Sequence, residues 1–435
     1  MRKISKLSLV AAVAVAGFST ANAQPLEEAI KNVEVSGSVV YRYNDYNNDS
    51  NDAVAAKGKP IGESTDANNN YKIALNLSSK VNDYVKFNSR FIVGGADSGF
   101  ATLDSSDNGD QNVDVTLSHA YFGLTAIPNT TVNVGKQGLT TPWTVAIDSD
   151  GNEQTGTGAL ALSTFGPVTA AAGYFNQTNL GKSGDILPKL NSKTNNPVVD
   201  GNGNPVPGSY IGSTTNDDFG DKDIIVGGLI ADLSPVTLEA WYLDMDDLFD
   251  TYTLSADSTF KFDGGKIGFD ARYVSLTLDD NVADAIANGK EDNATTILTL
   301  TGNVGIVNAK VAYANTDKDG GITALDQDSK NTLLGWNITS LNKADADYWQ
   351  AVLGVNVLDN LNLSANYGNI QYKVNNNTSN EVEEEEIYAQ LTYKMSKNLN
   401  TYVRYGTYTK ENKFGGSDKD INDDVRGRLQ VEYTF

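Results

Sequence analysis

The sequence predicts an all-β protein, a transmembrane antiparallel β-barrel of about 18 strands with a third loop that folds into the barrel. Near the chain end, apolar residues occupy positions 429, 431, 433 and 435, and polar residues occupy 428, 430, 432 and 434. This alternation gives a strand one apolar and one polar face. After residue 24, no segment approaches the roughly 18 uncharged apolar residues that a spanning helix requires, and the mean hydropathy is −0.35. A closed barrel reconciles this polarity with a membrane, because it pairs backbone groups between strands and needs apolar side chains on one face only.

The N-terminus predicts export. Arg2, Lys3 and Lys6 precede an apolar segment at 7–18, and Ala21-Asn22-Ala23 follows as a small-x-small cleavage site. The apolar segment is too short to span a bilayer as a helix. We therefore expect a signal peptide at 1–23 and a barrel domain at 24–435, secreted through the inner membrane to the bacterial outer membrane. Residues 25–32 are compatible with either a short helix or a mobile tail.

Strand-length segments with alternating polarity follow one another along the mature chain. Tight turns and long polar loops alternate between them, as in outer-membrane barrels with short periplasmic turns and long outer loops. One tight turn is expected at Asn303, and the connection at 247–249 is short where a long one is expected. The expected strands are 33–45, 71–80, 84–94, 112–125, 130–137, 158–165, 168–176, 222–233, 235–246, 250–261, 266–278, 293–302, 304–315, 347–358, 360–373, 384–395, 398–410 and 424–435.

Charge and composition narrow the possible functions. The formal charge is −22 and becomes −25 when the three basic residues of the signal are removed. This balance argues against nucleic acid and favours small cations as partners. The absence of cysteine excludes disulfides and thiolate sites. His119 is the single histidine, and no residue spacing indicates a catalytic site, so we expect a protein that is not an enzyme.

Alternation places a set of basic side chains inside the barrel. Their strands become neighbours when the first strand closes against the last, so these residues form a candidate basic wall of the pore. The alternative is that interior charges only solvate the lumen and bond one another. The set comprises Arg42, Lys86, Arg90, Arg404, Arg426 and Arg428.

A loop at about 138–157 is the candidate constriction opposite this wall. It begins apolar with Trp143, and no lysine or arginine occurs from position 138 through 181. Its carboxylates Asp148, Asp150 and Glu153 would line the pore. The run Asp148 to Glu153 also resembles half a calcium loop, with oxygen ligands at alternate positions and a glycine at the turn. The alternative is a solvated acidic turn without a metal.

Several segments resemble the major outer membrane protein porins of Campylobacter-type bacteria. They are residues 25–37 (PLEEAIKNVEVSG), Tyr41-Arg42-Tyr43, Gly135-Lys136-Gln137 with Trp143-Thr144, and Gly156-Thr157-Gly158. The resemblance implies a homotrimeric, eighteen-stranded general diffusion porin in outer-membrane lipid and lipopolysaccharide, with the third loop in the lumen. It implies passage of ions and small hydrophilic solutes with cation preference, without a required cofactor. Lys136 would then join the basic wall, yet alternation with Val132 and Val134 places it on the lipid side unless a bulge re-aims it.

Other features have competing interpretations. The segment 118–124 is apolar on both faces, which predicts a face covered by another subunit with His119 packed there. The run Glu383 to Glu386 is expected as a solvated rim. A rival function is a surface adhesin or receptor that binds host or phage through loops 177–221 and 316–346. An enzyme would need His119 beside an exposed serine or a matched acidic site.

Overall fold

The computed structural model describes residues 33–48, 64–102, 113–185, 219–286, 290–374, 380–414 and 417–435. The expected signal peptide and the segment 25–32 lie outside them. The described residues form one antiparallel sheet of eighteen long strands and one two-residue strand, β4. The strands are β1 (Val33–Asn48), β2 (Ser64–Asn82), β3 (Val85–Gly94), β4 (Ala101–Thr102), β5 (Asp114–Leu124), β6 (Thr130–Gly138), β7 (Thr155–Phe165), β8 (Val168–Thr178), β9 (Ile224–Asp232), β10 (Val236–Met245), β11 (Phe249–Phe262), β12 (Gly265–Leu278), β13 (Asp292–Val304), β14 (Val307–Thr316), β15 (Ala344–Leu358), β16 (Leu361–Lys373), β17 (Asn380–Lys394), β18 (Leu399–Phe414) and β19 (Ser417–Thr434).

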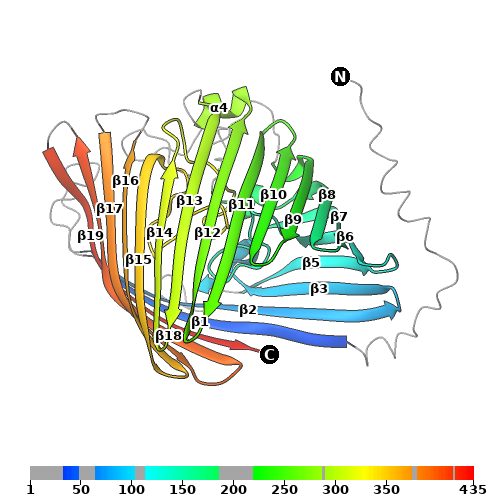
Figure 1. The fold of residues 1–435 in the computed structure, drawn as a ribbon, viewed down its shortest axis with the longest axis horizontal. Coiled ribbons are helices and arrows are strands. Elements are labelled where there is room, and N and C mark those ends of the chain that lie inside the picture. Colours follow the sequence, from blue (N-terminus) through cyan, green and yellow to red (C-terminus); the bar gives the residue numbers. More distant parts are fainter. Residues whose placement is uncertain are drawn as a thin grey trace.

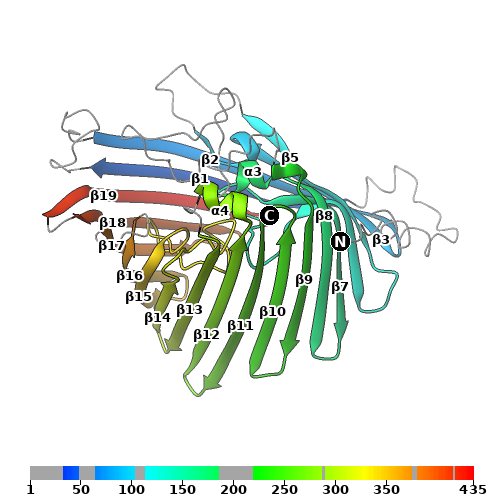
Figure 2. The ribbon, with the colours of Figure 1, turned by 90° about the horizontal axis from the view of Figure 1, so that it is seen from above.

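The sheet closes into a barrel. β1 pairs with β2 on one side and with β19 on the other, so that Tyr41 lies opposite both Tyr71 and Val431. The long strands otherwise pair with their neighbours in sequence and run around one continuous wall (Figures 1 and 2). Closure removes free sheet edges, which a bilayer does not tolerate. The expected eighteen-stranded barrel is confirmed.

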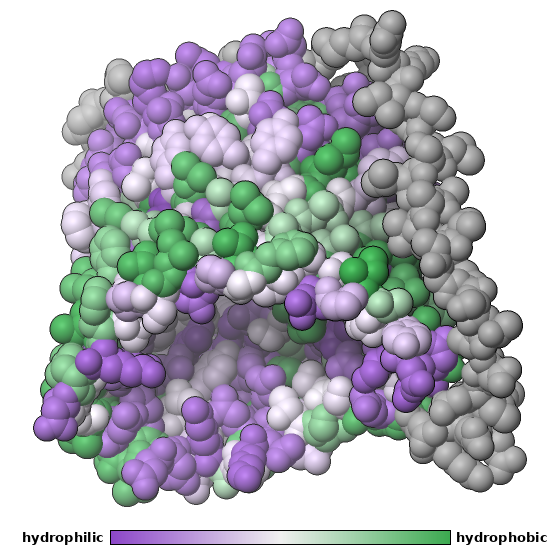
Figure 3. Space-filling model, turned by 45° about the vertical axis from the view of Figure 1, so that its right-hand side comes forward, coloured by the Kyte–Doolittle hydropathy of each residue, from purple (hydrophilic) through white to green (hydrophobic). Residues whose placement is uncertain are grey.

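The two faces of the wall differ as the alternation predicts. Val35, Val403 and Tyr405 are 55%, 49% and 65% exposed on the outer face, whereas Arg42 and Gln430 are 6% exposed on the inner face. In Figure 3 hydrophobic side chains form a band across the molecule between hydrophilic regions, and the surface is hollowed below the band. Within the described part of the chain, no helix is long and apolar enough to cross a membrane.

The tight turns have the residues that their backbone geometry needs. Gly264 between β11 and β12 has φ +83°, and Gly305 between β13 and β14 has φ +55°, a conformation that costs glycine little. The turn expected at Asn303 was placed wrongly, because Asn303 still pairs with Asn308 inside the ladder. The polar Gly302-Asn303 pair resembled a turn, but the left-handed position at Gly305 decides where the chain reverses.

Two connections between strands contact inward-facing side chains of the barrel, among them Lys72 and Arg90 for the first and Glu386 for the second. They are residues 139–154, between β6 and β7, and residues 317–343, between β14 and β15. Short helices α3 (Leu180–Ser183) and α4 (Asp280–Ile286) and the 3₁₀ turns η1 (Ala96–Ser98) and η2 (Phe219–Asp221) complete the described elements. The resulting core includes Leu139, Trp143, Phe175, Leu180, Ile224, Leu243, Met245, Leu276, Val282, Ile322 and Leu325.

Candidate functional site: a charged constriction inside the barrel

The segment 139–154 is closed at its base and anchored by a buried side chain. The Leu139 amide donates to the Gln154 carbonyl at 2.9 Å, and the Gln154 amide donates to the Val145 carbonyl at 2.9 Å. Trp143 is fully buried in the core. Its carbonyl accepts the Leu325 amide of the second inner segment at 2.9 Å. The two inner segments therefore support each other.

Glu153 forms a buried ion pair with Arg90 of β3. The Arg90 Nε and Nη2 atoms donate to Glu153 Oε1 at 2.9 and 2.5 Å, and the Ser118 hydroxyl donates to Oε2 at 2.5 Å. Glu153 is fully buried and Arg90 is 6% exposed. Hydrogen bonds from a charged guanidinium group to a carboxylate are short and strong. The pair fastens the loop to the wall.

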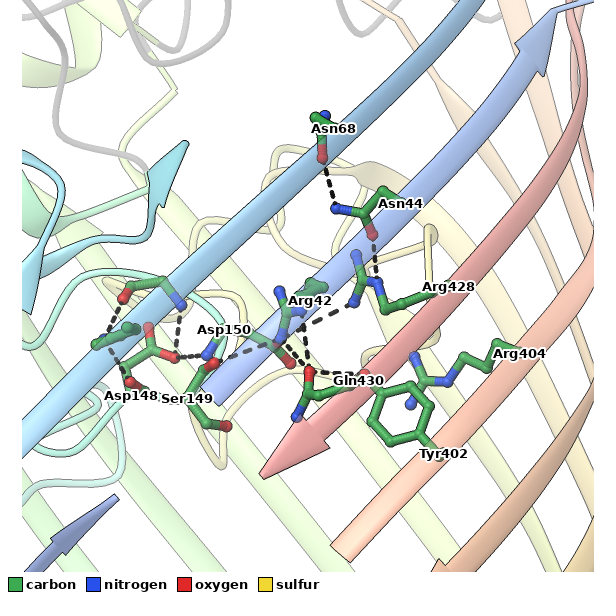
Figure 4. Close-up of polar contacts among 12 residues, drawn as sticks. Arg42, Asn44, Asn68, Asp148, Ser149, Asp150, Tyr402, Arg404, Arg428 and Gln430 are labelled. Atoms are coloured by element: carbon green, nitrogen blue, oxygen red, sulfur yellow. Dashed lines mark hydrogen bonds and ion pairs between the residues drawn. The ribbon is translucent and has the colours of Figure 1, made fainter. Parts of the chain in front are cut away.

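Asp150 and the loop backbone bind the next two strands. Arg42 of β1 contacts Asp150 and also donates to Gln430 Oε1 of β19 at 2.9 Å (Figure 4). The Lys72 ammonium of β2 donates to the carbonyls of Asp148 and Gly151 at 2.6 and 2.8 Å. The expectation that the loop lies opposite the basic wall is therefore wrong. The loop lies against Arg42 and Arg90, because its acids find partners there.

Two other members of the expected basic wall lie elsewhere. Lys86 also faces the interior, but it lies at the end of the barrel where β1 begins, and its Nζ is 3.7 Å from Glu34 of β1. Lys136 donates to the Leu117 carbonyl at 2.6 Å, whereas its neighbours Gln137 and Asn133 line the inner cavity. Lys136 thus points outward, as the alternation of β6 predicts. The resemblance to the porin family implied instead that Lys136 belongs to the basic wall of the pore.

The remaining arginines form a row on β18 and β19. Arg404 and Arg428 are direct cross-strand partners, and both guanidinium groups face the Trp336 ring, at 5.6 and 5.8 Å from its centroid. Arg426 is instead paired with Asp424 and lies over Tyr408. Figure 4 shows Arg404, Arg428 and Arg42 following one another along the inner wall toward Asp150.

The second inner segment was not predicted from the sequence. Residues 320–326 are all buried, and Glu386 of β17 accepts the Trp336 and Asn337 amides at 2.9 and 2.8 Å. Glu384 accepts hydrogen bonds from Tyr372 and Tyr408 at 2.7 and 2.9 Å. The expectation of a solvated rim at 383–386 is wrong for these two glutamates. Glu384 and Glu386 alternate with Glu383 and Glu385 along β17, and alternate residues of a strand lie on opposite faces. This alternation is the feature of the sequence from which the inward orientation of two of the four glutamates could have been predicted.

The burial of 320–326 also bears on the rival surface-binding function. A segment that packs between strands inside the barrel presents little surface to a host protein or phage. The other loop of that hypothesis, 177–221, lies mostly outside the described residues.

Three carboxylates meet where the two inner segments approach each other. Asp148, Asp326 and Asp328 can each place one oxygen within 4.8 Å of the other two. Burial, together with Asp185, raises the pKa of Asp326 to about 8, and burial with Asp148 raises the pKa of Asp328 to about 7. Burial also raises the pKa of Asp148, although the Asp150 and Gly151 amides donate to its Oδ1 at 2.6 and 2.7 Å.

This cluster fits a hard divalent cation better than the expected set did. Carboxylate oxygens are the ligands that Ca²⁺ prefers, and carboxylates crowded away from water need a neutralising cation or a proton. Of the expected ligands, only Asp148 belongs to the cluster, because Asp150 and Glu153 are bound to arginines. The other two carboxylates come from a segment 178 residues further along the chain, which local spacing cannot reveal.

A cavity of about 690 Å³ lies beside the inner segments. It is lined by Arg90, His119, Gln137 and Trp241, among other residues of β1 to β10. His119 therefore faces the interior and is not a subunit contact on the outer face. A bulge between β3 and β5 at Arg90 and Phe91 turns both Ser118 and His119 inward, which explains why alternation failed there. Ser118, the sequence neighbour of His119, is 2% exposed and donates to Glu153.

The whole chain, residues 1–435, matches the sequence profile described as Campylobacter major outer membrane protein. The chain belongs to this family. The family and the closed barrel place the protein in the outer membrane. Curated protein sequences yield no match to it.

Solved structures share the fold. Pseudomonas aeruginosa OpdQ superposes with a TM-score of 0.66 at 19% identity, covering 92% of this chain and 99% of its own. P. aeruginosa OccK5 (OpdH) gives 0.64 at 16% identity over 93% and 98%. P. aeruginosa OccK2 (OpdF) in complex with glucuronate gives 0.63 at 14% over 92% and 98%. At these identities the likeness shows the architecture alone.

Proposed function

We propose that this member of the family is a general diffusion porin that passes ions and small hydrophilic solutes across the outer membrane with a preference for cations. The observation that carries the proposal is a closed barrel whose interior is crossed by two polar segments, 139–154 and 317–343, and lined by charged side chains. A barrel of about eighteen strands encloses a water-filled channel where loops do not fill it. Transport through it requires no chemical step.

The cation preference rests on local charge. Asp148, Asp326 and Asp328 form no ion pair within the described residues. Along the adjacent wall, Arg42 and Arg426 are neutralised by carboxylates, which leaves Arg404 and Arg428. When they are deprotonated, the three carboxylates face Arg404, Arg428 and the Lys72 ammonium, so the preference for a passing cation depends also on the formal charge of −22 of the whole chain.

In this proposal, Asp148, Asp326 and Asp328 bind one calcium ion. It would tie segment 139–154 to segment 317–343 and thereby set the pore width, and it would reduce the local negative charge. Neither Asp150 nor Glu153 takes part in this revised set.

The assembly is proposed as a homotrimer in outer-membrane lipid and lipopolysaccharide, exported by the cleavable signal at 1–23. Small side chains on the outer face of β7 and β8 support a protein-covered surface: Ala161 lies opposite Ala172, and Ser163 lies opposite Ala170. Lys136 on the neighbouring strand is costly against lipid but acceptable in a subunit contact.

The test is electrical. Purified protein in a planar bilayer should give stepwise, ohmic conductance without any partner, and the reversal potential in a potassium chloride gradient should have the sign of cation selectivity. Conductance only in the presence of a host or phage protein would refute the diffusion pore. An anion-selective reversal potential would refute the charge argument and leave the pore itself intact.

A further inference from the structure

The arginine row contains two guanidinium groups that the protein neutralises weakly or not at all: within the described residues Arg404 forms no ion pair, and Arg428 is paired only with Asp150, at 3.9 Å. Arg404 and Arg428 are direct cross-strand partners, a position where like charges repel. Arg428 donates to Asn44 Oδ1 at 2.8 Å and to the Tyr46 hydroxyl at 3.1 Å. Arg404 donates from Nε to Gln390 Oε1 at 2.5 Å, and among the described residues its Nη1 and Nη2 atoms have no acceptor.

Aromatic rings hold both groups in place. The Arg404 guanidinium lies 4.8 Å from the Tyr402 centroid and 5.5 Å from that of Tyr388. Trp336 faces both arginines, and its backbone amide is fixed by Glu386 at 2.9 Å. A pair of preoriented guanidinium groups with free N–H donors is the arrangement that recognises a carboxylate.

One acidic group stands at the end of the row. Asp150 Oδ1 is 3.9 Å from Arg428 Nη1, and the Asp150 side chain is 49% exposed. Its contact with Arg42 uses the same Oδ1 atom, so Oδ2 remains available to a cation. The wall thus offers a positive and a negative group 3.9 Å apart, Arg428 and Asp150, which lie beside each other in Figure 4.

We propose that Arg404, Arg428 and Asp150 form a subsite for small amphoteric solutes, such as α-amino acids, on the wall of the pore. The solute carboxylate binds between the two arginines, beside Trp336, and its ammonium group faces Asp150. This inference rests on the proposed diffusion pore and names a solute class that such a pore favours. A solute that carries both charges interacts with both ends of the subsite, whereas a neutral isomer interacts with neither.

The experiment compares two isomers of the same composition, glycine, which is amphoteric, and glycolamide, which is neutral. In proteoliposome swelling at millimolar concentration, the unmodified protein should admit glycine faster than glycolamide. The double variant Arg404→Gln and Arg428→Gln, and separately Asp150→Asn, should each lower the glycine to glycolamide ratio about threefold or more. Lys310→Gln is the matched control, because it removes an inner-wall charge that bonds Gln350 on the far strands β14 and β15.

The outcomes separate the subsite from the pore. If neither isomer enters through the unmodified protein, the diffusion pore fails. If both enter and the ratio is one, or the ratio is insensitive to these substitutions, the subsite is refuted. If the arginine double variant lowers the ratio but Asp150→Asn leaves it unchanged, the site does not bind the solute ammonium group, and the assignment to amphoteric solutes is refuted. Should the double variant fail to fold, single-channel current of the unmodified protein decides: glycine should reduce the potassium current saturably and glycolamide should not, and equal responses overturn the proposal.

Discussion

At the residue scale, the ion pairs that hold the third loop differ greatly in burial. Arg90 and Glu153 have side chains 7% and 0% exposed, whereas Asp150, the partner of Arg42, is 49% exposed. Both arginines are 7% exposed, so the difference lies in the acids. A fully buried charge that loses its partner keeps its desolvation cost, whereas Asp150 is half solvated and Arg42 keeps Gln430 as an acceptor. The two acids of one loop therefore contribute unequally to its position.

We expect Glu153→Ala to reduce the free energy of unfolding by about 3–5 kcal/mol, because it leaves the Arg90 guanidinium buried and unpaired. Asp150→Asn, the matched control on the same loop, should cost about 0–1 kcal/mol. Urea titration of the protein in lipid vesicles measures the free energy of unfolding of both variants. Equal costs would contradict the burial that separates the two pairs.

The acidic cluster links stability to pH and calcium. The pKa values of Asp326 and Asp328, raised to about 8 and about 7, exceed the value of about 3.9 in an unfolded chain. Without a cation, the folded barrel therefore loses stability as pH rises from about 4 to about 8, the reverse of the usual aspartate. Calcium binds the deprotonated carboxylates, so its stabilising effect should grow over the same range.

We predict that calcium at about 100-fold its dissociation constant stabilises the barrel by about 2–3 kcal/mol at pH 8 and by much less at pH 6. Thermal unfolding with calcium and with chelator measures the difference. The double variant Asp326→Asn and Asp328→Asn should lose the response. A calcium shift that is independent of pH would point to binding elsewhere.

At the element scale, alternation predicted every long strand, because a strand between lipid and water needs one face of each kind. It could not show where infolded segments go. Segment 317–343 is polar enough for an outer loop, and its position depends on Glu386, which accepts the Trp336 and Asn337 amides from about 50 residues away. Long-range hydrogen bonds of this kind leave no local pattern. The same limit applies to the carboxylates that join Asp148.

Facing can be tested on one strand. On β13, Ile297 is 4% exposed inside and Leu298 is 41% exposed outside, so Thr299 again faces inward. We expect Leu298→Arg to cost about 2–4 kcal/mol near the middle of the bilayer, and Thr299→Arg to cost far less. Unfolding free energies in vesicles provide the comparison. Similar losses for Leu298→Arg and Thr299→Arg would mean that the faces are assigned wrongly.

Thr299 is a better inward control than Gln430. Gln430 accepts hydrogen bonds from Arg42 and Tyr402, so its replacement would break contacts as well as change the polarity of the inner face.

At the scale of the whole molecule, the barrel and its charge act together on passing ions. An ion about 5 Å from one carboxylate feels roughly 1–3 kcal/mol at effective dielectric constants of 80 to 20. Arg404 and Arg428 oppose this attraction, and bound calcium reduces it. The sequence predicted an acidic constriction of Asp148, Asp150 and Glu153, but Arg42 and Arg90 balance the charges of Asp150 and Glu153.

Selectivity should therefore follow Asp326 and Asp328 more than Glu153. Above pH 8 and with calcium chelated, Asp326→Asn with Asp328→Asn should lower the cation to anion permeability ratio severalfold, read from the reversal potential in a potassium chloride gradient. The effect should shrink with salt, since the screening length falls from about 8 Å at physiological ionic strength to about 3 Å at 1 M. Adding calcium to the unmodified protein should move the reversal potential in the same direction, because the ion neutralises the same carboxylates. Asp263→Asn, in the exposed turn between β11 and β12, serves as the control that removes one carboxylate outside the constriction. If that control shifts the potential as much as the double variant does, selectivity arises from the overall charge of the barrel and not from its constriction.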